Sequence, residues 1–573
     1  MQKTFAFLAL VATVFADVTL HEARAPREGW SVTNQAVDLS QHIRINIGMK
    51  RQNVDMLHAF VRKVSDPESS SYGQYMTQKQ LANMIAPSQE AVDVVLRWLK
   101  AADIEGRVDF HKDYIHFVAP LSKIESLLSV KFAMYKHVKG GRQVARAIEA
   151  VVVPDAVAQV AEVVTGTQGF PLPTNGPTRV KRGHFDAGMA PEVTPDVIRA
   201  SYNITTTAAS TKNIQAIAEF QGQYVDTTDL SKFCTQYDNG AQCKVAKFIH
   251  QNNPGQPGIE SSLDIEYIMS IAKGVETWVY SYPNFDFCSD LLTWASDITA
   301  SGSGTHPSVV SMSYGSQKLD FCPAASMTRL NEDVAKFGAI GITSVIASGD
   351  SGSGQYSREG YNGGKLCPSF PASINYCLAI GATTFISGSS GEEQATTQFG
   401  SGGGFSWNFK ADSFAHAGVD GYFKELTAKG KTPSLQFEKT GRQSPDVSLL
   451  GQGFHVINGG QNIQVGGTSA STPTWSGIIS LLNNHRFAQG KPAFGYINPW
   501  IYSVPETCFH DITVGTNAIS PNTIGWAAEK GWDAATGRGT PNCPCLLSHA
   551  GSAPAPGPSP PTPPGPPAPP SPP

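Results

Sequence analysis

Two short segments of the sequence carry side chains that could perform nucleophilic catalysis together. In Gly258-Ile-Glu-Ser-Ser-Leu-Asp264, Glu260 and Asp264 stand four residues apart, so on a helix their carboxyl groups share one face. Later in the chain, Gly466-Gly-Thr-Ser-Ala-Ser-Thr-Pro473 is a glycine turn that leads Ser469 into a helix. A serine hydroxyl is a weak nucleophile until a neighbouring base takes its proton. Here the candidate base is a carboxylate rather than a histidine, which predicts serine chemistry that works in acid.

Each segment also has a plainer interpretation. A glycine turn before Ser469 could simply cap a helix, and two acids at this spacing are common on a solvated helix face. The helix expected over residues 259–272 is largely apolar, however, with Leu263 and Ile268 beside the acids. Two carboxyl groups in such surroundings are costly unless they have a function. Because two close carboxyls cannot both ionise cheaply, we expect the pair to hold one proton between them.

A third acid, Asp350, follows an apolar strand in Ser344-Val-Ile-Ala-Ser-Gly-Asp-Ser-Gly352. An aspartate after a strand is more often a turn residue that is hydrogen-bonded to its own backbone. Ligands, however, approach the carboxyl edge of a parallel sheet. A protonated aspartic acid at that edge can donate a hydrogen bond to an oxyanion, beside the amide of Ser469 at the helix N-terminus.

The elements that must position these residues fall into two regions. Before residue 165, helical and strand-like segments alternate without cysteines, which predicts a compact α+β unit. After residue 195, short apolar strands alternate with helices, which predicts an α/β domain with a largely parallel sheet covered on both faces. The expected helices are 56–64, 91–101, 122–128, 259–272, 291–299, 327–337 and 471–484, and the expected strands are 108–110, 114–118, 133–137, 214–220, 277–280, 308–313, 342–347 and 377–380.

The N-terminus predicts entry into the secretory pathway. Residues 1–16 place Lys3 ahead of an apolar run that ends in the small-residue pattern of a signal-peptidase site. This run is too short to span a bilayer, and no later stretch is long and apolar enough to do so. Asn203-Ile-Thr205 is then a candidate glycosylation site.

Two further segments have the composition of extended chain. Residues 169–188 are rich in proline and glycine and contain Lys181-Arg182, which predicts an exposed activation linker. Residues 551–573 contain 13 prolines and almost nothing apolar enough to pack, which predicts a polyproline-like disordered tail. The predicted folded regions are therefore 17–168 and 189–550.

Cysteine content and charge narrow the functional class. Nine cysteines agree with an oxidising compartment, and a net charge of −4 gives no reason to expect nucleic acid or a membrane surface as partner. Spacing does not fix connectivity, and the odd number leaves at least one thiol unassigned. The candidate bridges are the local pairs Cys234/Cys243 and Cys367/Cys377, and one bridge within the group Cys508, Cys543 and Cys545.

Taken together, these segments resemble the sedolisin (serine-carboxyl peptidase) family. The resemblance runs from Ser65-Asp-Pro-Glu-Ser-Ser-Ser-Tyr-Gly-Gln-Tyr75 to Gly531-Trp-Asp533, with several motifs in the family's order. It implies a subtilisin-like catalytic domain with a parallel sheet, preceded by an α+β ferredoxin-like prodomain, and it places the mature N-terminus near Met189.

The resemblance also implies a role for each candidate residue. Ser469 would be the nucleophile, Glu260 the general base, Asp264 the residue that orients and polarises Glu260, and Asp350 the oxyanion donor. The strand edge that pairs with substrate would be Ser313, Tyr314 and Gly315, and Gly403 would lie in a loop near the cleft, in Gly402-Gly-Gly-Phe-Ser406.

One structural calcium ion near the C-terminus is a further implication of the resemblance. Its ligands would be the carboxylates of Asp511 and Asp533, the backbone carbonyls of Ile512, Glu529 and Gly531, and a water, which is the hard oxygen shell that calcium prefers. Glu529 stands where close relatives carry glycine, but only its carbonyl is needed. Without the resemblance, two separated aspartates would not indicate a metal.

The expected function is that of an acid-acting serine-carboxyl peptidase, made as a secreted zymogen and releasing tripeptides. A sedolisin-type endopeptidase and an inactive secreted homologue are the alternatives. A subtilisin would need a His-Gly-Thr base and an Asp-Thr-Gly strand end, and the sequence has neither. The expected partners are peptide or protein substrates and the chain's own prodomain as inhibitor, with no nucleic acid and no membrane anchor. We expect a monomer in a lysosome, an acidic vacuole or the extracellular space.

Overall fold

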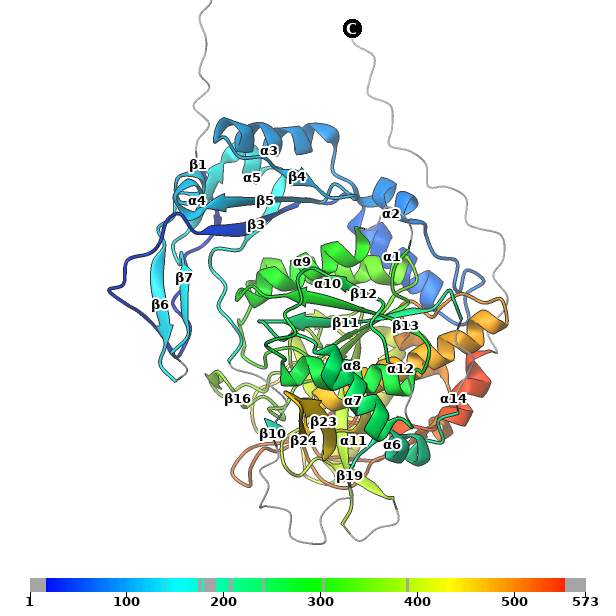
Figure 1. The fold of residues 1–573 in the computed structure, drawn as a ribbon. Helices are drawn as coiled ribbons and strands as arrows, with labels where there is room; N and C mark the ends of the chain where they lie inside the picture. Colours follow the sequence, from blue (N-terminus) through cyan, green and yellow to red (C-terminus); the bar gives the residue numbers. More distant parts are fainter. Residues whose placement is uncertain are drawn as a thin grey trace, which may run out of the picture. The chain divides into compact units, whose positions relative to one another are not determined.

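A computed structural model of the chain describes residues 17–139, 141–173, 178–179, 192–205, 210–239, 243–300, 305–387 and 391–551. The predicted signal peptide, most of the predicted linker with Lys181-Arg182 and Met189, and nearly all of the predicted tail lie outside the described residues. The chain forms two units, shown as a ribbon in Figure 1. The first contains the chain up to Arg51 and Ala86–Gln168, and the second contains Gln52–Ile85 and the chain from Gly169 onward. No helix in the described ranges combines the length and apolar character that a membrane crossing requires.

The first unit is built on a four-stranded antiparallel sheet in the order β4-β5-β3-β9. Alternate residues of β3, including Ile45 and Ile47, are fully buried in one cluster with Val95 of α3 and Ile124 of α4. Strand and helix order along the chain give the ferredoxin-like arrangement predicted for this region. The main elements are β3 (His42–Met49), α3 (Gln89–Ala101), β4 (Arg107–Val108), β5 (Tyr114–Pro120), α4 (Leu121–Leu128) and β9 (Ala161–Thr165).

Two smaller sheets complete this unit, one with the order β1-β8 and the other β2-β6-β7. Their strands pair antiparallel. The bounds are β1 (Asp17–His21), β2 (Trp30–Val32), β6 (Ala133–His137), β7 (Gln143–Arg146) and β8 (Val151–Pro154), with the short helix α5 (Asp155–Ala158) after β8.

Part of the predicted prodomain belongs to the second unit. Helix α1 (Val54–Ser65) packs against α10 (Ala324–Ala339), and α2 (Gln78–Ile85) follows it. The Arg62 guanidinium donates to Asp412 Oδ1 at 2.9 Å, and the Tyr75 hydroxyl donates to the carbonyl of Ala493 at 3.0 Å. These helices therefore belong to the second unit rather than to the ferredoxin-like sheet.

The second unit contains a parallel sheet in the order β12-β13-β11-β14-β15-β18, to which β22 adds in parallel and β19 in antiparallel orientation. Its central strands are buried on both faces, which is why they are nearly continuous apolar runs in the sequence. Each strand predicted after residue 195 is present. The bounds are β11 (Ile214–Phe220), β12 (Lys247–Ile249), β13 (Glu276–Tyr282), β14 (Val309–Met312), β15 (Thr343–Ala347), β18 (Leu378–Phe385), β19 (Glu393–Ala395) and β22 (Val447–Leu450).

Helices cover both faces of this sheet, as the sequence predicted (Figure 1). Helices α8 (Ile259–Ile271) and α12 (Thr468–Ala488) lie on one face, and α9 (Phe287–Thr299) and α10 on the other. Helices α8 and α12 pack closely together, and a Cβ on Gly477 would come within 2.8 Å of the Ile271 Cβ. Glycine at this position therefore lets the two helices that carry the candidate catalytic residues approach closely.

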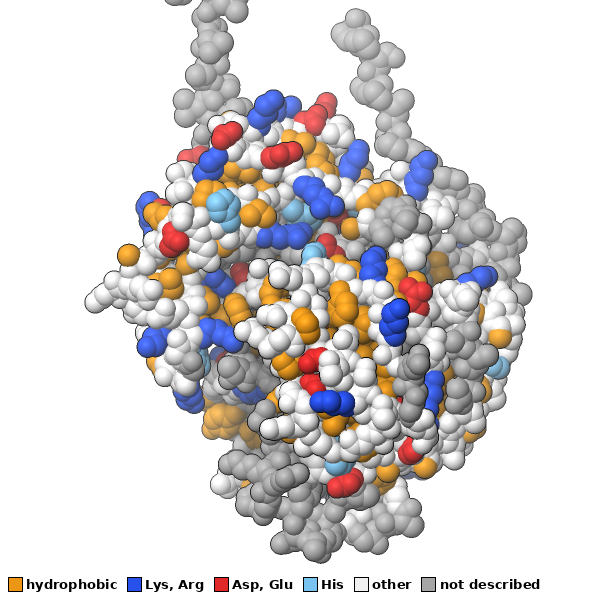
Figure 2. All heavy atoms as spheres, viewed as in Figure 1, with side chains coloured by type: hydrophobic (Ala, Val, Ile, Leu, Met, Phe, Trp, Pro, Cys, Tyr) orange, Lys and Arg blue, Asp and Glu red, His pale blue; other side chains and the backbone are white. Residues whose placement is uncertain are grey.

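Elements outside this sheet close the rest of the second unit. Figure 2 shows the face of the second unit that carries α8, α9 and α10. Acidic and basic side chains are interspersed on this face, in keeping with the small net charge of the chain. The remaining larger elements are α6 (Pro195–Ser201), α7 (Thr227–Tyr237), β20 (Gly404–Lys410), α11 (His416–Ala428), β21 (Gly441–Ser444), β23 (Phe454–Asn458), β24 (Gln461–Gly466), α13 (Asn498–Ser503) and α14 (Cys543–Ala550).

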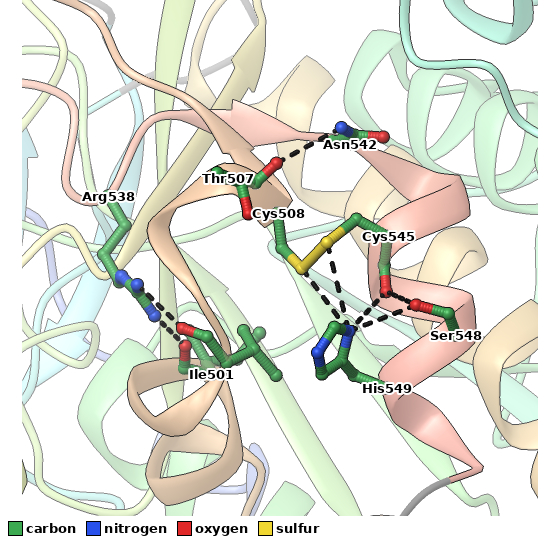
Figure 3. The surroundings of a disulfide bond; sticks show 9 residues. Ile501, Thr507, Cys508, Arg538, Asn542, Cys545, Ser548 and His549 are labelled. Carbon is green, nitrogen blue, oxygen red and sulfur yellow. Dashed lines mark hydrogen bonds between the residues drawn. A yellow bond between two sulfur atoms is a disulfide. The ribbon is translucent and has the colours of Figure 1, made fainter.

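The disulfide bonds confirm some of the predicted cysteine pairs and show that another predicted pair does not form. The bridges are Cys234–Cys243, Cys288–Cys322 and Cys508–Cys545, the last of which ties α14 to the chain before it (Figure 3). A bridge between Cys367 and Cys377 was a wrong expectation, because both are free thiols. The Cys377 thiol donates to the carbonyl of Ala372, and the Cys367 thiol to that of Pro368, so each is held within its own segment.

Candidate active site

Three neighbouring strands of the parallel sheet deliver polar side chains to one edge. Glu219 lies near the carboxyl end of β11, Ser313 follows β14 and Asp350 follows β15. Ser313, Asp350, Glu260 and Ser469 line one cavity of about 50 Å³. The sheet edge and the two close helices thus bring together residues that are far apart in the sequence.

Ser469 lies in the first turn of α12, after the glycine turn predicted from the sequence. Gly467 is the N-cap, with φ of 155°, and a Cβ there would come within 3.0 Å of Asp350 Oδ2. Glycine therefore allows Asp350 to approach the start of the helix. Ser469 is 6% exposed, and its hydroxyl oxygen lies 3.4 Å from the carbonyl oxygen of Ser313.

Glu260 and Asp264 lie four residues apart on α8 and both are buried, and Glu260 lines the cavity with Ser469. Burial raises the pKa of Glu260 well above its ordinary value; the hydrogen bond from Ser469 opposes this, and the nearby charges of Glu219 and Asp350 reinforce it. Asp264 Oδ1 accepts a hydrogen bond from the Ser313 hydroxyl at 2.8 Å. Burial also raises the pKa of Asp264 well above its ordinary value. The pair therefore retains protons at pH values where exposed carboxyls have lost theirs.

Glu219 is a third buried carboxyl that the sequence reasoning missed. It accepts a hydrogen bond from the Tyr314 hydroxyl at 2.7 Å and interacts with Asp264. Burial raises its pKa to about 8, while the hydrogen bonds lower it. The available signal was a single acid inside the otherwise mostly apolar strand 214–220. Glu219 extends the acid network from Ser469 through Glu260 and Asp264 to Tyr314.

Asp350 is held against the N-terminus of α12 from two sides. Its Oδ1 accepts hydrogen bonds from the backbone N–H of Thr468 at 2.8 Å and from the Thr468 hydroxyl at 3.0 Å. Its Oδ2 accepts from the Arg358 guanidinium at 3.2 Å. The sequence predicted Asp350 at this edge but gave no indication of Arg358. These contacts place an acidic side chain where charge on a substrate oxygen would develop beside Ser469.

The candidate substrate-binding residues divide into two groups. Ser313, Tyr314 and Gly315 line the cavity with Ser469. Gly403 lies beside the turn that carries Asp350, where its N–H donates to the carbonyl of Gly352 at 3.1 Å. A Cβ at Gly403 would come within 1.8 Å of the carbonyl oxygen of Ala534, so the glycine is needed for close backbone packing.

The candidate calcium ligands lie around one short segment, residues 529–533. Asp511 Oδ2 accepts a hydrogen bond from the Gly531 N–H at 2.9 Å, and the fully buried Asp533 accepts one from the Glu529 N–H at 3.2 Å. Burial raises the pKa of Asp533 to about 8. The Glu529 carboxylate is directed to two lysines, Lys429 and Lys431, each at 2.6 Å, which leaves its backbone carbonyl as the group available to the site.

The arrangement around Ser469 is suited to acyl transfer. A hydroxyl at a helix N-terminus, a carboxyl network beside it and a further acid near the developing oxyanion are the parts such a reaction requires.

Comparison with known proteins gives matches over both units. The profile described as "Pro-kumamolisin, activation domain" matches residues 28–170, and that of the "Subtilase family" matches residues 268–504. A Pseudomonas sedolisin structure, described as a serine-carboxyl proteinase, shares the fold with a TM-score of 0.50 and 23% identity, covering 63% of this chain and 98% of that one.

Similarity to curated proteins extends over most of the chain. Tripeptidyl-peptidase 1 of Rattus norvegicus is 34% identical over 564 residues, which cover 94% of this chain and 98% of the rat protein. The Homo sapiens protein of the same name is 33% identical over 544 residues, covering 91% and 93%. The chain therefore belongs to the sedolisin-type serine peptidases, the family that includes tripeptidyl-peptidase 1.

Proposed function

We propose that this chain is an acid-acting serine-carboxyl peptidase that removes tripeptides from the N-termini of peptides. The observation that supports this most directly is the convergence of Ser469, Glu260 and Asp350 on one cavity at the carboxyl edge of the sheet. Similarity to tripeptidyl-peptidase 1 supports the exopeptidase choice. A sedolisin-type endopeptidase is the alternative.

In the proposed mechanism the Ser469 hydroxyl oxygen attacks the carbonyl carbon of the scissile peptide bond. Its proton passes to the ionised form of Glu260, which is present when the one proton shared by the pair lies on Asp264, and Asp264 orients and polarises Glu260. The carbonyl oxygen becomes an oxyanion that accepts hydrogen bonds from the Ser469 amide and from protonated Asp350. Glu260 then gives its proton to the leaving amine, which releases the first product. Water hydrolyses the acyl-enzyme by the same steps in reverse order.

The prodomain is proposed to hold this enzyme inactive until it reaches an acidic compartment. Helix α1 and the segment after it are built into the peptidase unit through Arg62 and Tyr75, so they support its fold before cleavage. We infer that the chain enters the secretory pathway and acts in a lysosome, an acidic vacuole or outside the cell. Asn203 is exposed, as glycosylation in that pathway requires.

Product analysis tests the proposed specificity. Incubation of the mature enzyme at acid pH with a defined peptide is expected to release successive tripeptides, detected by mass spectrometry. The same peptide with an acetylated N-terminus is expected to remain intact, because an exopeptidase site is closed beyond the third residue. Internal cleavage of the acetylated peptide would establish the endopeptidase alternative, and cleavage of neither peptide would establish an inactive homologue.

A structural calcium ion is also proposed, bound by Asp511, Asp533 and the carbonyls of Ile512, Glu529 and Gly531. The residues fit a cation, because Asp533 is fully buried and forms no ion pair with any residue in the described part of the chain. A divalent ion would supply the missing positive charge and link two separate segments of the chain.

Removal of calcium is expected to lower the melting temperature of the mature enzyme by at least about 5 °C, because an ion that binds only the folded state stabilises it by linkage. Calorimetry with and without EDTA measures this. Asp533→Asn should reproduce the shift in excess calcium, whereas Asp420→Asn, an exposed position on α11, should not. Purified enzyme that contains no calcium by elemental analysis, with melting unaffected by EDTA, would contradict the proposal.

A further inference from the structure

The cavity beside Ser469 contains more charge than the proposed reaction uses. Its charged lining residues are Glu260, Asp350, Arg358 and Glu359. Burial favours the neutral form of Glu260, and Asp350 is paired with Arg358 at 3.2 Å. Glu359 forms no ion pair with any residue that the structure describes, and it serves no step of the mechanism. Glu359 is therefore an acidic side chain of the cavity lining that neither the proposed reaction nor an ion pair with a described residue accounts for.

Glu359 is held at the tip of a short hairpin. Strands β16 (Tyr356–Ser357) and β17 (Gly360–Tyr361) flank it, and the rings of Tyr356 and Tyr361 lie 5.0 Å apart across the pair. The Glu359 N–H donates to the Ser357 hydroxyl at 3.2 Å. This local bonding fixes the backbone from which the carboxylate projects.

The hairpin is anchored to the segment that carries the candidate substrate-binding edge. The buried amide of Asn362 donates to the carbonyls of Gln317 and Gly354, each at 2.7 Å. The Ser316 hydroxyl, next to Gly315, donates to Glu359 Oε1 at 2.6 Å. The position of the carboxylate is thus set before any substrate arrives, which reduces the entropic cost of recognition.

A solvated surface carboxylate is the plainer interpretation of Glu359. Such side chains are mobile and turn toward water, whereas this one is half-buried and bonded toward the cavity. One neutral hydroxyl satisfies only part of the hydrogen-bonding capacity of a carboxylate, which can accept about four hydrogen bonds. The remaining lone pairs are available to a donor group on a ligand.

We propose that Glu359 is a specificity-determining residue that recognises a positively charged group of the peptide substrate. An ammonium or guanidinium group would form a charge-assisted hydrogen bond with it in the cavity next to the nucleophile. The charge can come from a basic side chain next to the scissile bond or from the free N-terminal amine of the substrate. This inference rests on the proposed peptidase function and names the class of substrate that the site favours.

Two pairs of peptides distinguish these sources. The first pair differs by lysine or norleucine immediately before the scissile bond, with free N-termini throughout. The second pair has norleucine at that position and differs by a free N-terminal amine or its replacement with a hydrogen atom, which removes the charge without lengthening the peptide. The ratio of kcat/KM within each pair is measured at about pH 5.5, where an ordinary glutamate carries its charge.

The wild-type enzyme is compared with Glu359→Gln, which keeps the shape of the side chain and removes its charge, and with Glu359→Asp, which keeps the charge. Glu276→Gln is the matched control, because Glu276 also accepts one hydrogen bond from a neutral donor, Trp278 Nε1 at 2.7 Å, but lies at the amino end of β13, away from the cavity.

The wild-type enzyme is expected to favour the cationic member of one pair by about tenfold, as a charge-assisted hydrogen bond allows. Glu359→Gln should abolish most of this preference, Glu359→Asp should retain part of it, and Glu276→Gln should leave it unchanged. The pair that responds identifies the source of the charge. Ratios that Glu359→Gln leaves unchanged in both pairs, or an equal loss on all four peptides, would overturn the inference. Wild-type enzyme that cleaves none of the peptides would instead refute the proposed function itself and the inference with it.

Discussion

Replacement of Ser469 by alanine is expected to lower kcat by roughly 10⁴-fold or more, because the nucleophile of a serine peptidase acts as a unit with its base. The same change should block maturation. Purified Ser469→Ala zymogen is expected to remain full length on acidification, whereas wild-type zymogen should release its prodomain. Peptide turnover and electrophoresis of acidified samples measure the two effects.

Ser476→Ala is the matched control for this experiment. Ser476 lies on the same helix, is buried, and donates its hydroxyl hydrogen to the carbonyl of Thr472 at 2.9 Å, so its loss removes a hydroxyl of similar surroundings. This variant should mature and turn over peptide. If the Ser469→Ala zymogen, purified without other proteases, matured as fast as wild type, the prediction that the enzyme cleaves its own prodomain would be wrong. If this variant still hydrolysed peptide at the wild-type rate, Ser469 would not be the nucleophile.

Activity is expected to peak well below neutrality and to collapse as the pH rises. Ionised Asp350 would repel the oxyanion it must stabilise. Negative charge also accumulates in the buried network, where burial raises the pKa of Glu219 to about 8. A folded pKa above the unfolded value means that the stability from protonated Glu219 is full below about pH 4.5 and is lost as the pH rises through 8. Unfolding temperature and kcat/KM measured from pH 3 to pH 9 test both statements.

Glu219→Gln separates the stability effect from the catalytic one. Glutamine keeps an acceptor for the Tyr314 hydroxyl but cannot ionise, so the variant should melt at a higher temperature than wild type at pH 8 and at a similar temperature at pH 4. Equal melting curves at pH 8 would show that the pKa of Glu219 in the folded protein is not raised above its value in the unfolded chain. A wild-type activity maximum at pH 8 would refute the acid mechanism.

Local sequence patterns were sufficient to predict the main elements of both units. Apolar runs such as 214–220 and 342–347 are strands of the parallel sheet because strands buried on both faces need continuous hydrophobicity. The glycine turn before Ser469 is a helix start because Gly467 has a backbone conformation that side chains disfavour. These features depend on neighbouring residues only, so a linear chain reveals them.

Only the tertiary structure reveals the contacts between segments that are far apart in the sequence. Spacing could not show that Cys367 and Cys377 remain thiols, because a bridge requires two chain segments to meet. Nor could it show that α1, from the predicted prodomain, joins the peptidase unit through Arg62 and Asp412.

The candidate active site was likewise predicted in part from the sequence and in part only from the tertiary structure. The sequence by itself determined the chemistry available, because the types and spacing of Glu260, Asp264 and Ser469 indicate a carboxylate-activated serine before any fold is known. Only the tertiary structure decided that Glu219 joins these acids and that Glu359 faces the same cavity. The physical reason is that pKa shifts and ligand recognition arise from burial and from charges brought together across neighbouring strands and loops, and neither quantity exists until the chain has folded.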